Sequence, residues 1–337
     1  MEYWIPWGGS EVFFEAPEEA TVITPLTTRM TEAEIASKLS KLSSTALLII
    51  DYLPPAKAYE PLLSSVASIS PKIYVTSWRL GEDIAEDAVG ELRGLAGNLE
   101  IEPLGNLHQL DAYSGEVTFV YPSTTRVLLE GFADSPRDIL GWLLRFHGHR
   151  DLDVSGLSVK ALELLFTPDG NIQAVWAEGE TPTSQRLDPH SILVSPGKAP
   201  LDSHFYNVAQ AIIVAASTCN DETTILAVAE CKQGLGPPEF VKNLHQYIKL
   251  GETEKPGLNS SPSEIIAYRL SEILKNAKTY LATPLPRSLV QAIVGSKAFE
   301  TVQEGVSHLI RLHGRGQKIL VIRDGLHRVP NIGLHPP

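Results

Sequence analysis

Two histidines and an acidic residue fall within five positions in the segment HGHRD, residues 147–151. Imidazole nitrogens bind zinc or nickel when a third ligand converges on the same point, and Asp151 or Asp153 could orient one ring by accepting its second N–H. The alternative is a polar loop after a helix, whose C-terminus favours a protonated His147. We therefore predict His147 and His149 as candidate catalytic and metal-ligating residues that would bind nickel or zinc directly.

A second candidate lies in the segment TILAVAECKQGLGPPEF, residues 224–240, where an apolar run leads into Glu230, two glycines and two prolines. A strand that turns through glycines into a helix puts its loop at the carboxyl edge of a sheet, where open α/β folds place ligands. Free N–H groups at the start of the helix would suit an anion. In the alternative, Gly234 and Gly236 only let the backbone turn.

Two other functions of this loop are weaker. The pattern GxxxxGK[ST] of a phosphate-binding loop is absent, since Lys232 precedes the glycines. Cys231 could be a nucleophile activated by the helix that follows, but no histidine adjoins it in the sequence, and a buried cysteine at the end of a strand is the more common case.

Helices and short apolar strands alternate through most of the chain, a pattern that indicates βαβ units and mainly parallel sheets. We predict two α/β domains, residues 1–150 and 151–337, with a ligand cleft between them. A helix should begin at Ser135-Pro136, and Thr167-Pro168-Asp169-Gly170 should join a hairpin. The polar segment 178–201 is expected to be a linker or a long surface loop.

The composition limits the classes of partner. The 337 residues carry a formal net charge of -12, the wrong sign for a nucleic-acid or anionic-membrane binder, so a small anionic molecule bound at a local site is the expected partner. No apolar run is long enough to span a bilayer, and two cysteines argue against a disulfide framework. We expect a cytoplasmic protein.

Several segments, in the same order along the chain, resemble the nickel-pincer lactate racemase family. YWIPWGGSEVFFEAP is similar to the family's N-terminal strand pair, LLIIDYLPPAKAYEPLL to its Asp-x-Thr-Arg-Pro region, and KIYVTSWRL to the surroundings of its Gly-Thr-His-Arg motif. SHFYNVAQAI resembles the helix that opens the C-terminal domain, AECKQGLG the Ala-Glu-Cys-x-x-Gly-x-Gly segment, and KILVIRDGLHRVP the closing unit.

The resemblance implies a nickel ion held by a lysine-tethered dithio cofactor and a histidine, two more histidines as acid and base, and cationic groups on the substrate carboxylate. This sequence departs from that pattern. Pro54 stands for the expected arginine, Trp78 for a histidine, and Asn207 and Gln210 for glutamine and lysine. The segment that carries the cofactor lysine has no counterpart between Gly105 and Arg150, which argues against the covalent cofactor.

Two functions follow as hypotheses. The first is an isomerase or epimerase of a small 2-hydroxy acid or sugar acid; the second is a non-catalytic anion-binding or regulatory paralogue. Arg79 is the best carboxylate clamp by bidentate pairing, with a surface ion pair as its alternative, and His327 should lie in a solvated tail. The candidate substrate-binding residues, expected to line the cleft, are Asp51, Trp78, Arg79, Asn207, Gln210, Glu230, Gly234 and Gly236.

Overall fold

The computed structural model divides into two compact units. Unit 1 comprises Met1–Leu26, Thr183–Pro256 and Pro262–Pro337, and unit 2 comprises Thr27–Pro182 and Gly257–Ser261. The residues that the structure describes are 1–25, 30–42, 44–80, 85–107, 116–149, 154, 157–167, 171–177, 180, 183–184, 187–220, 222–257, 259–330 and 332–333.

The predicted division at residue 150 is wrong in two respects. The segment that follows residue 150 belongs to unit 2, and the first strands of the chain belong to unit 1. The hairpin of β8 (Val159–Phe166) and β9 (Ile172–Ala177) continues the sheet of unit 2, because β8 pairs in parallel with β7 (Val117–Pro122). The strand β3 (Thr21–Ile23) instead pairs in parallel with β15 (Lys318–Ile322). The chain therefore begins in unit 1, builds unit 2, and returns to unit 1.

Unit 2 is a six-stranded sheet in the order β6-β5-β4-β7-β8-β9, parallel except for β9. The expected hairpin is confirmed, although residues 168–170 of its turn lie outside the described residues. The remaining strands and the helices of this unit are β4 (Leu47–Asp51), β5 (Lys72–Thr76), β6 (Ile101–Pro103), α1 (Glu32–Leu39), α2 (Glu60–Val66), α3 (Ala85–Ala96), α4 (Ser123–Leu129) and α5 (Pro136–Phe146).

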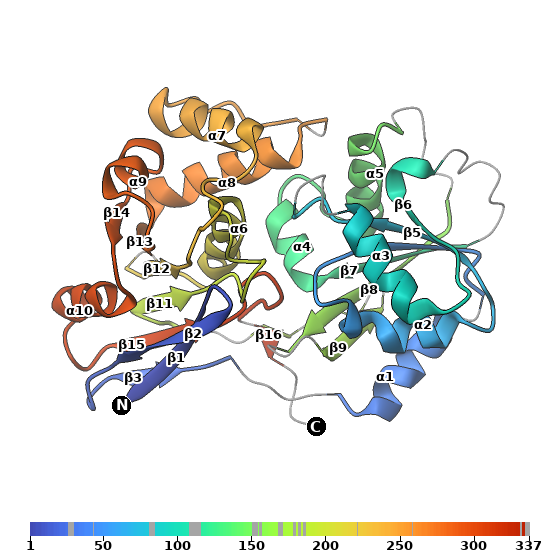
Figure 1. The fold of residues 1–337 in the computed structure, drawn as a ribbon, viewed down its shortest axis with the longest axis horizontal. Coiled ribbons are helices and arrows are strands. Elements are labelled where there is room, and N and C mark those ends of the chain that lie inside the picture. Colours follow the sequence, from blue (N-terminus) through green and yellow to red (C-terminus); the bar gives the residue numbers. More distant parts are fainter. Residues whose placement is uncertain are drawn as a thin grey trace. The chain divides into compact units, whose positions relative to one another are not determined.

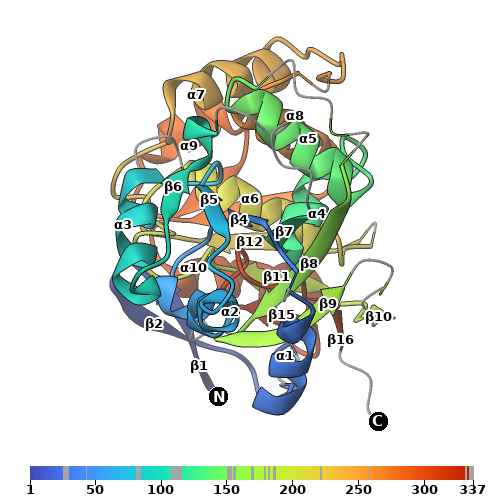
Figure 2. The ribbon, with the colours of Figure 1, turned by 90° about the vertical axis from the view of Figure 1, so that its right-hand side faces the viewer.

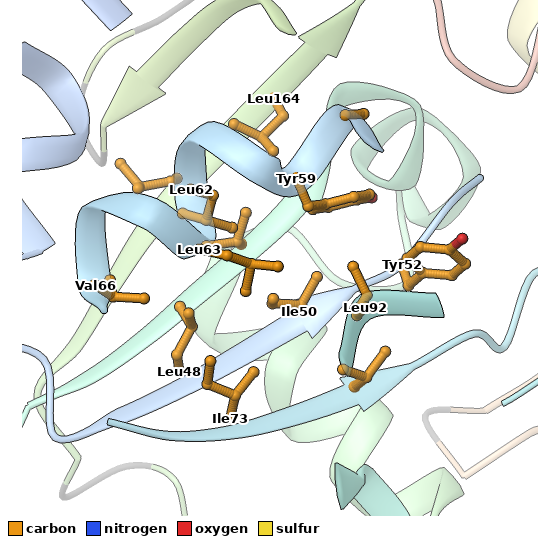
Figure 3. Close-up of a cluster of buried hydrophobic side chains, with 14 of the residues drawn as sticks. Leu48, Ile50, Tyr52, Tyr59, Leu62, Leu63, Val66, Ile73, Leu92 and Leu164 are labelled. Carbon is orange, nitrogen blue, oxygen red and sulfur yellow. The ribbon is translucent and has the colours of Figure 1, made fainter. Parts of the chain in front are cut away.

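The two faces of this sheet have different coverings, α2 and α3 on one side and α4 and α5 on the other (Figures 1 and 2). Alternate residues of β4, Leu48 and Ile50, pack with Leu62 and Leu63 of α2 in the main apolar core (Figure 3). Because side chains alternate along a strand, Asp51 points to the opposite face. Strands buried on both faces read as continuous apolar runs, which is why LLIID was recognisable.

Local signals fix the two helices on the site's side of the sheet. Ser135 caps α5 by accepting a hydrogen bond from the N–H of Asp138, whose carboxylate bonds back to the Ser135 backbone, so the predicted helix start is confirmed. The helix α4 follows β7 directly, with Pro122 at its N-cap position. This sharp turn puts the first residues of α4 at the carboxyl edge of the sheet.

Unit 1 is built on a parallel six-stranded sheet in the order β14-β13-β12-β11-β15-β3. One face is covered by α6, and the other carries the antiparallel hairpin of β1 and β2 together with α10 (Figure 1). Its other elements are β1 (Glu2–Trp7), β2 (Ser10–Glu15), β10 (Thr183–Ser184), β11 (Ser191–Val194), β12 (Thr224–Val228), β13 (Lys278–Ala282), β14 (Lys297–Phe299), β16 (Ile332–Gly333), α6 (Phe205–Ala216), α7 (Pro238–Leu244), the π-helix His245–Lys249, α8 (Pro262–Asn276), α9 (Arg287–Ile293) and α10 (Val302–His313).

The expectation of a linker or loop over residues 178–201 is only partly right. Ser191–Val194 forms the fully buried strand β11, which lies between β12 and β15 in the sheet. Four residues are too few for the apolar pattern to stand out beside the surrounding prolines and glycines. Within the described residues, no helix is long and apolar enough to cross a bilayer.

Candidate functional site

The carboxyl edge of the unit 2 sheet gathers polar side chains from three neighbouring strands. Asp51 ends β4, Thr76 ends β5, and Ser123 follows β7 at the start of α4. Asp51 and Thr76 are direct partners in the parallel register, so their side chains project from the same face of the sheet. Open α/β sheets bind ligands at this edge.

Asp51 is fully buried, and its Oδ2 accepts a hydrogen bond of 2.6 Å from the hydroxyl of Thr125 in α4. Burial raises the pKa of this carboxyl to about 6, although Arg79, Thr125 and Trp78 each oppose the rise. Removing a carboxylate from water disfavours its charged form, and here that effect is larger than the attraction of the nearby guanidinium. Asp51 can therefore gain or lose a proton close to neutral pH.

Arg79 is fully buried as well, so its alternative assignment as a surface ion pair is wrong. Its Nη2 donates a 2.7 Å hydrogen bond to Oγ1 of Thr124, and the guanidinium carbon lies 5.8 Å from the centre of the Trp78 ring. Trp78 in turn packs edge-on against Trp142 at 5.1 Å. An aromatic face and a hydroxyl thus hold a buried cation in a fixed orientation.

Two buried hydroxyl groups, close in sequence to Arg79 and Thr124, make no hydrogen bond to any described residue. They are Oγ of Ser77, two positions before Arg79, and Oγ of Ser123, next to Thr124. Buried polar atoms are almost always paired in folded proteins, because an unpaired one loses the hydrogen bonds that it made with water. These two hydroxyls are free to bind a ligand or ordered water.

His147 is the C-cap residue of α5, and its Nε2 lies 2.8 Å from Oγ1 of Thr76. Burial, assisted by the neighbouring His149, lowers the pKa of His147 to about 4. The helix C-terminus was expected to favour the protonated ring, but burial has the larger effect and the ring is neutral at pH 7. The structure therefore brings His147 to the same face of the sheet as Asp51.

His149 points its Nε2 at the carbonyl oxygen of Leu104, 3.0 Å away. A carbonyl can only accept, so this nitrogen carries the proton and only Nδ1 is free to bind a metal. No group of three possible metal ligands occurs among the described residues, while Arg150, Asp151 and Asp153 lie outside them. Direct binding of nickel or zinc by the two histidines stays a prediction.

The other predicted substrate-binding residues lie in unit 1. Asn207 and Gln210 are buried on α6, and the Gln210 amide approaches Oδ1 of Asn207 at 3.5 Å. The loop of Glu230–Gly236 follows β12 and packs against the start of α6, where the N–H groups of Phe205 and Tyr206 donate to its carbonyls. These two N–H groups at the start of α6 are therefore already hydrogen-bonded within the protein.

The glycines of this loop have different reasons for being glycine. Both have positive φ, +86° at Gly234 and +103° at Gly236. A Cβ at Gly236 would lie 2.6 Å from Cβ of Tyr206, whereas the space around Gly234 is open. Gly236 is thus required by close packing as well as by the turn, which supports a structural role.

Asp202 is a buried residue of unit 1, beside the Glu230 loop, that was not predicted from the sequence. Its Oδ2 accepts hydrogen bonds from the backbone N–H groups of Gly8 and of Glu230, the latter at 3.2 Å. Gly8 has φ +59°, and a Cβ there would collide with the Glu230 carboxylate. Asp202 therefore ties the turn between β1 and β2 to the Glu230 loop.

Two other expectations for unit 1 can be judged. Burial raises the pKa of the Cys231 thiol to about 12, so the group stays protonated and the buried, unreactive cysteine is the better interpretation. His327 was expected to be solvated but is buried. The tight turn after β15, in which the N–H groups of His327 and Arg328 both donate to the Asp324 carbonyl, draws this segment into the fold.

The predicted residues thus fall into two groups. Unit 2 brings Asp51, Trp78, Arg79 and His147 to one sheet edge, and unit 1 holds those of α6 and the Glu230 loop. Sequence reasoning missed Ser123, Thr124 and Thr125, which complete the first group. The signal was available in VTFVYPSTT, residues 117–125, where an apolar run precedes a proline and three hydroxyl residues.

Comparison with known proteins agrees with the expected resemblance. Residues 186–329 match the model of the lactate racemase C-terminal domain. A solved structure, the lactate racemase apoprotein from Thermoanaerobacterium thermosaccharolyticum, superposes with a TM-score of 0.61 and 17% identity, covering 97% of this chain and 99% of that one. No curated protein matches the chain.

Residues 186–329 are thus similar to the C-terminal domain of lactate racemases. The whole chain has a lactate racemase-like fold, two α/β units with mainly parallel sheets, as the sequence predicted. The pincer cofactor of that family does not fit this lactate racemase-like chain, because no lysine occurs between Lys72 and Lys160. The polar edge of unit 2 instead has Arg79 and five buried hydroxyl side chains, those of Thr76, Ser77, Ser123, Thr124 and Thr125.

Proposed function

We propose that this lactate racemase-like protein binds a small hydroxy carboxylate at the carboxyl edge of the unit 2 sheet. The observation that carries the proposal is the pair of unpartnered buried hydroxyls, Ser77 and Ser123, beside the buried guanidinium of Arg79. A guanidinium matches a carboxylate in charge and in its planar geometry. The serine hydroxyls suit the hydroxyl group of such a ligand, as either donors or acceptors.

The protonation state of Asp51 fits the same ligand. With a pKa raised to about 6 by burial, this carboxyl mainly accepts from a ligand hydroxyl at pH 7 and can donate to it in slightly acidic solution. The proposed partner is a small anionic molecule, which a chain of net charge -12 would bind only at a local cationic site. The expected cytoplasmic location stays a prediction.

Calorimetric titration with lactate, glycolate and small sugar acids tests this proposal. Arg79→Lys keeps the charge but loses the planar fork, so we expect binding to weaken by about tenfold or more. Arg93→Lys is the matched control, since Arg93 also lies in unit 2 and, among the described residues, bonds the carbonyl of Ile101 instead of the polar edge. Equal affinities for wild type and both variants would remove Arg79 from the site.

A second candidate, an isomerase or epimerase of the bound hydroxy acid, is favoured by the positions of Asp51 and His147. Asp51 and Thr76 project from one face of adjacent strands, and the ring of His147, at the end of α5, bonds Thr76 on that same face. With the pKa of His147 at about 4 and that of Asp51 at about 6, both groups are largely unprotonated at pH 7 and could act as bases.

Exchange at the carbon that bears the hydroxyl distinguishes these two functions. An isomerase that removes this proton would incorporate solvent deuterium, which NMR of lactate or a sugar acid detects. Loss of exchange in Asp51→Asn, with ligand binding retained, would support catalysis. Binding of the hydroxy acid without any exchange or inversion would leave the non-catalytic anion-binding function.

A further inference from the structure

A hollow on unit 1 lies among β14, α9 and α10. Its volume is about 390 Å³, and its lining residues are Arg287, Lys297, Ala298, Phe299, Thr301, Gln303, Glu304, Ser307 and Arg311. This volume is within the range of small-molecule sites, roughly 300–1,000 Å³. All of the lining residues belong to unit 1, so the hollow is separate from the polar edge of unit 2.

The charges around the hollow leave two cations without an anionic partner. Arg287 pairs with the carboxylates of Glu300 at 3.3 Å and Glu304 at 3.5 Å. Lys297 and Arg311 form no ion pair within the described part of the chain, and the Lys297 ammonium lies 4.9 Å from the Phe299 ring centre. Arg287 is therefore engaged by two acids, whereas Lys297 and Arg311 have no ion-pair partner among the described residues.

The field of these two cations converges at one side chain. His308 packs edge-on against Tyr280 at 4.8 Å and at a tilt against Phe299 at 5.2 Å. Burial lowers its pKa first, and Lys297 and Arg311 lower it further. Lys297 and Arg311 also line the same hollow, so both cations can contact one bound anion.

We propose that this hollow binds a small phosphomonoester. Lys297 and Arg311 can both bond the oxygens of a phosphomonoester, which carries more negative charge and more acceptor oxygens than a monocarboxylate. The hydroxyls of Ser307 and Thr301 line the same hollow and can donate to the remaining phosphate oxygens. The volume exceeds that of a bare phosphate, so the hollow has room for the organic part of the ligand as well.

Calorimetric titration of the full chain with adenosine monophosphate tests the proposal. We expect saturable binding that weakens by about tenfold or more in Lys297→Gln/Arg311→Gln. The control is Lys275→Gln/Arg315→Gln, which removes the same charge from other surface sites of unit 1, and we expect it to bind as wild type does. Equal weakening in both double variants would reduce the effect to general charge and overturn the proposal.

A titration of His308 by NMR gives a second, independent readout. Adenosine monophosphate at the hollow would neutralise Lys297 and Arg311 and raise the pKa of His308, while lactate at the same concentration should leave it in place. An unchanged His308 pKa at saturating adenosine monophosphate would overturn the site. Equal effects of lactate and the phosphomonoester would overturn the assigned ligand class.

Discussion

Burial shifts the pKa values of two groups of unit 2, Asp51 and His147, in opposite directions. Removing either group should therefore reveal the pH dependence of stability that the other one causes. Burial raises the pKa of Asp51 from 3.8 to about 6, so the folded chain holds this proton more tightly and stability falls as pH rises between these values. Burial lowers the pKa of His147 from 6.5 to about 4. The unfolded chain then holds that proton more tightly, and stability rises with pH over a similar range.

Each displacement corresponds to about 3 kcal/mol, at about 1.4 kcal/mol for each pH unit. In the wild type the two contributions largely cancel. The unfolding free energy of Asp51→Asn, measured relative to that of the wild type, should therefore rise by about 3 kcal/mol as the pH increases from about 4 to about 7. His147→Gln should lose a similar amount over the same range.

Urea unfolding, followed by the fluorescence of the buried Trp78 and Trp142, measures these differences at a series of pH values. The substituted side chains keep hydrogen-bonding atoms for Thr125 and Thr76, whose bonds to Asp51 and His147 would otherwise be lost. Parallel pH profiles for the wild type and both variants would refute the displaced pKa values and the acid–base role built on them.

Three further outcomes concern unit 1. Gly236→Ala should lower the free energy of unfolding, measured by thermal unfolding, by several kcal/mol, because its Cβ would lie 2.6 Å from Tyr206 at a φ of +103°. Gly234→Ala should lower it by about 1 kcal/mol, because only its φ is unfavourable. Equal losses in the two variants would contradict the close packing at Gly236. Cys231, with a pKa near 12, should resist iodoacetamide at pH 7 in the folded chain, and mass spectrometry of rapid alkylation would contradict this. Asp202→Ala should lower the unfolding free energy by about 3 kcal/mol in urea titrations, since two buried N–H groups lose their acceptor. An unchanged urea midpoint would argue against a stabilising role of Asp202 between Gly8 and the Glu230 loop.

The fold was predictable where local signals and apolar runs coincide, as at LLIID before Tyr52 and at the capped start of α5. The short strands were not. Thr21–Ile23 and Ser191–Val194 carry too few residues for a pattern, and a parallel strand is placed by partners far away in the sequence rather than by its own turn. The domain boundary at residue 150 failed for this reason.

The site was predictable as residue types but not as partners. Asp51, Trp78 and Arg79 follow strands that the sequence identified, so their location at a sheet edge could be expected. That Arg79 is buried on Thr124, and Asp51 on Thr125, depends on the neighbouring strand β7, whose place beside β4 no local pattern records. The same holds for the depressed pKa of His147, which follows from burial against Thr76.

The most direct test of the proposed function is a structure of the chain with its best-binding 2-hydroxy acid. The account predicts the ligand carboxylate within about 3 Å of the Arg79 guanidinium, and its hydroxyl bonded to Ser77 or Ser123. Ordered water on both serines with the acid bound elsewhere, such as at the Glu230 loop, would contradict it.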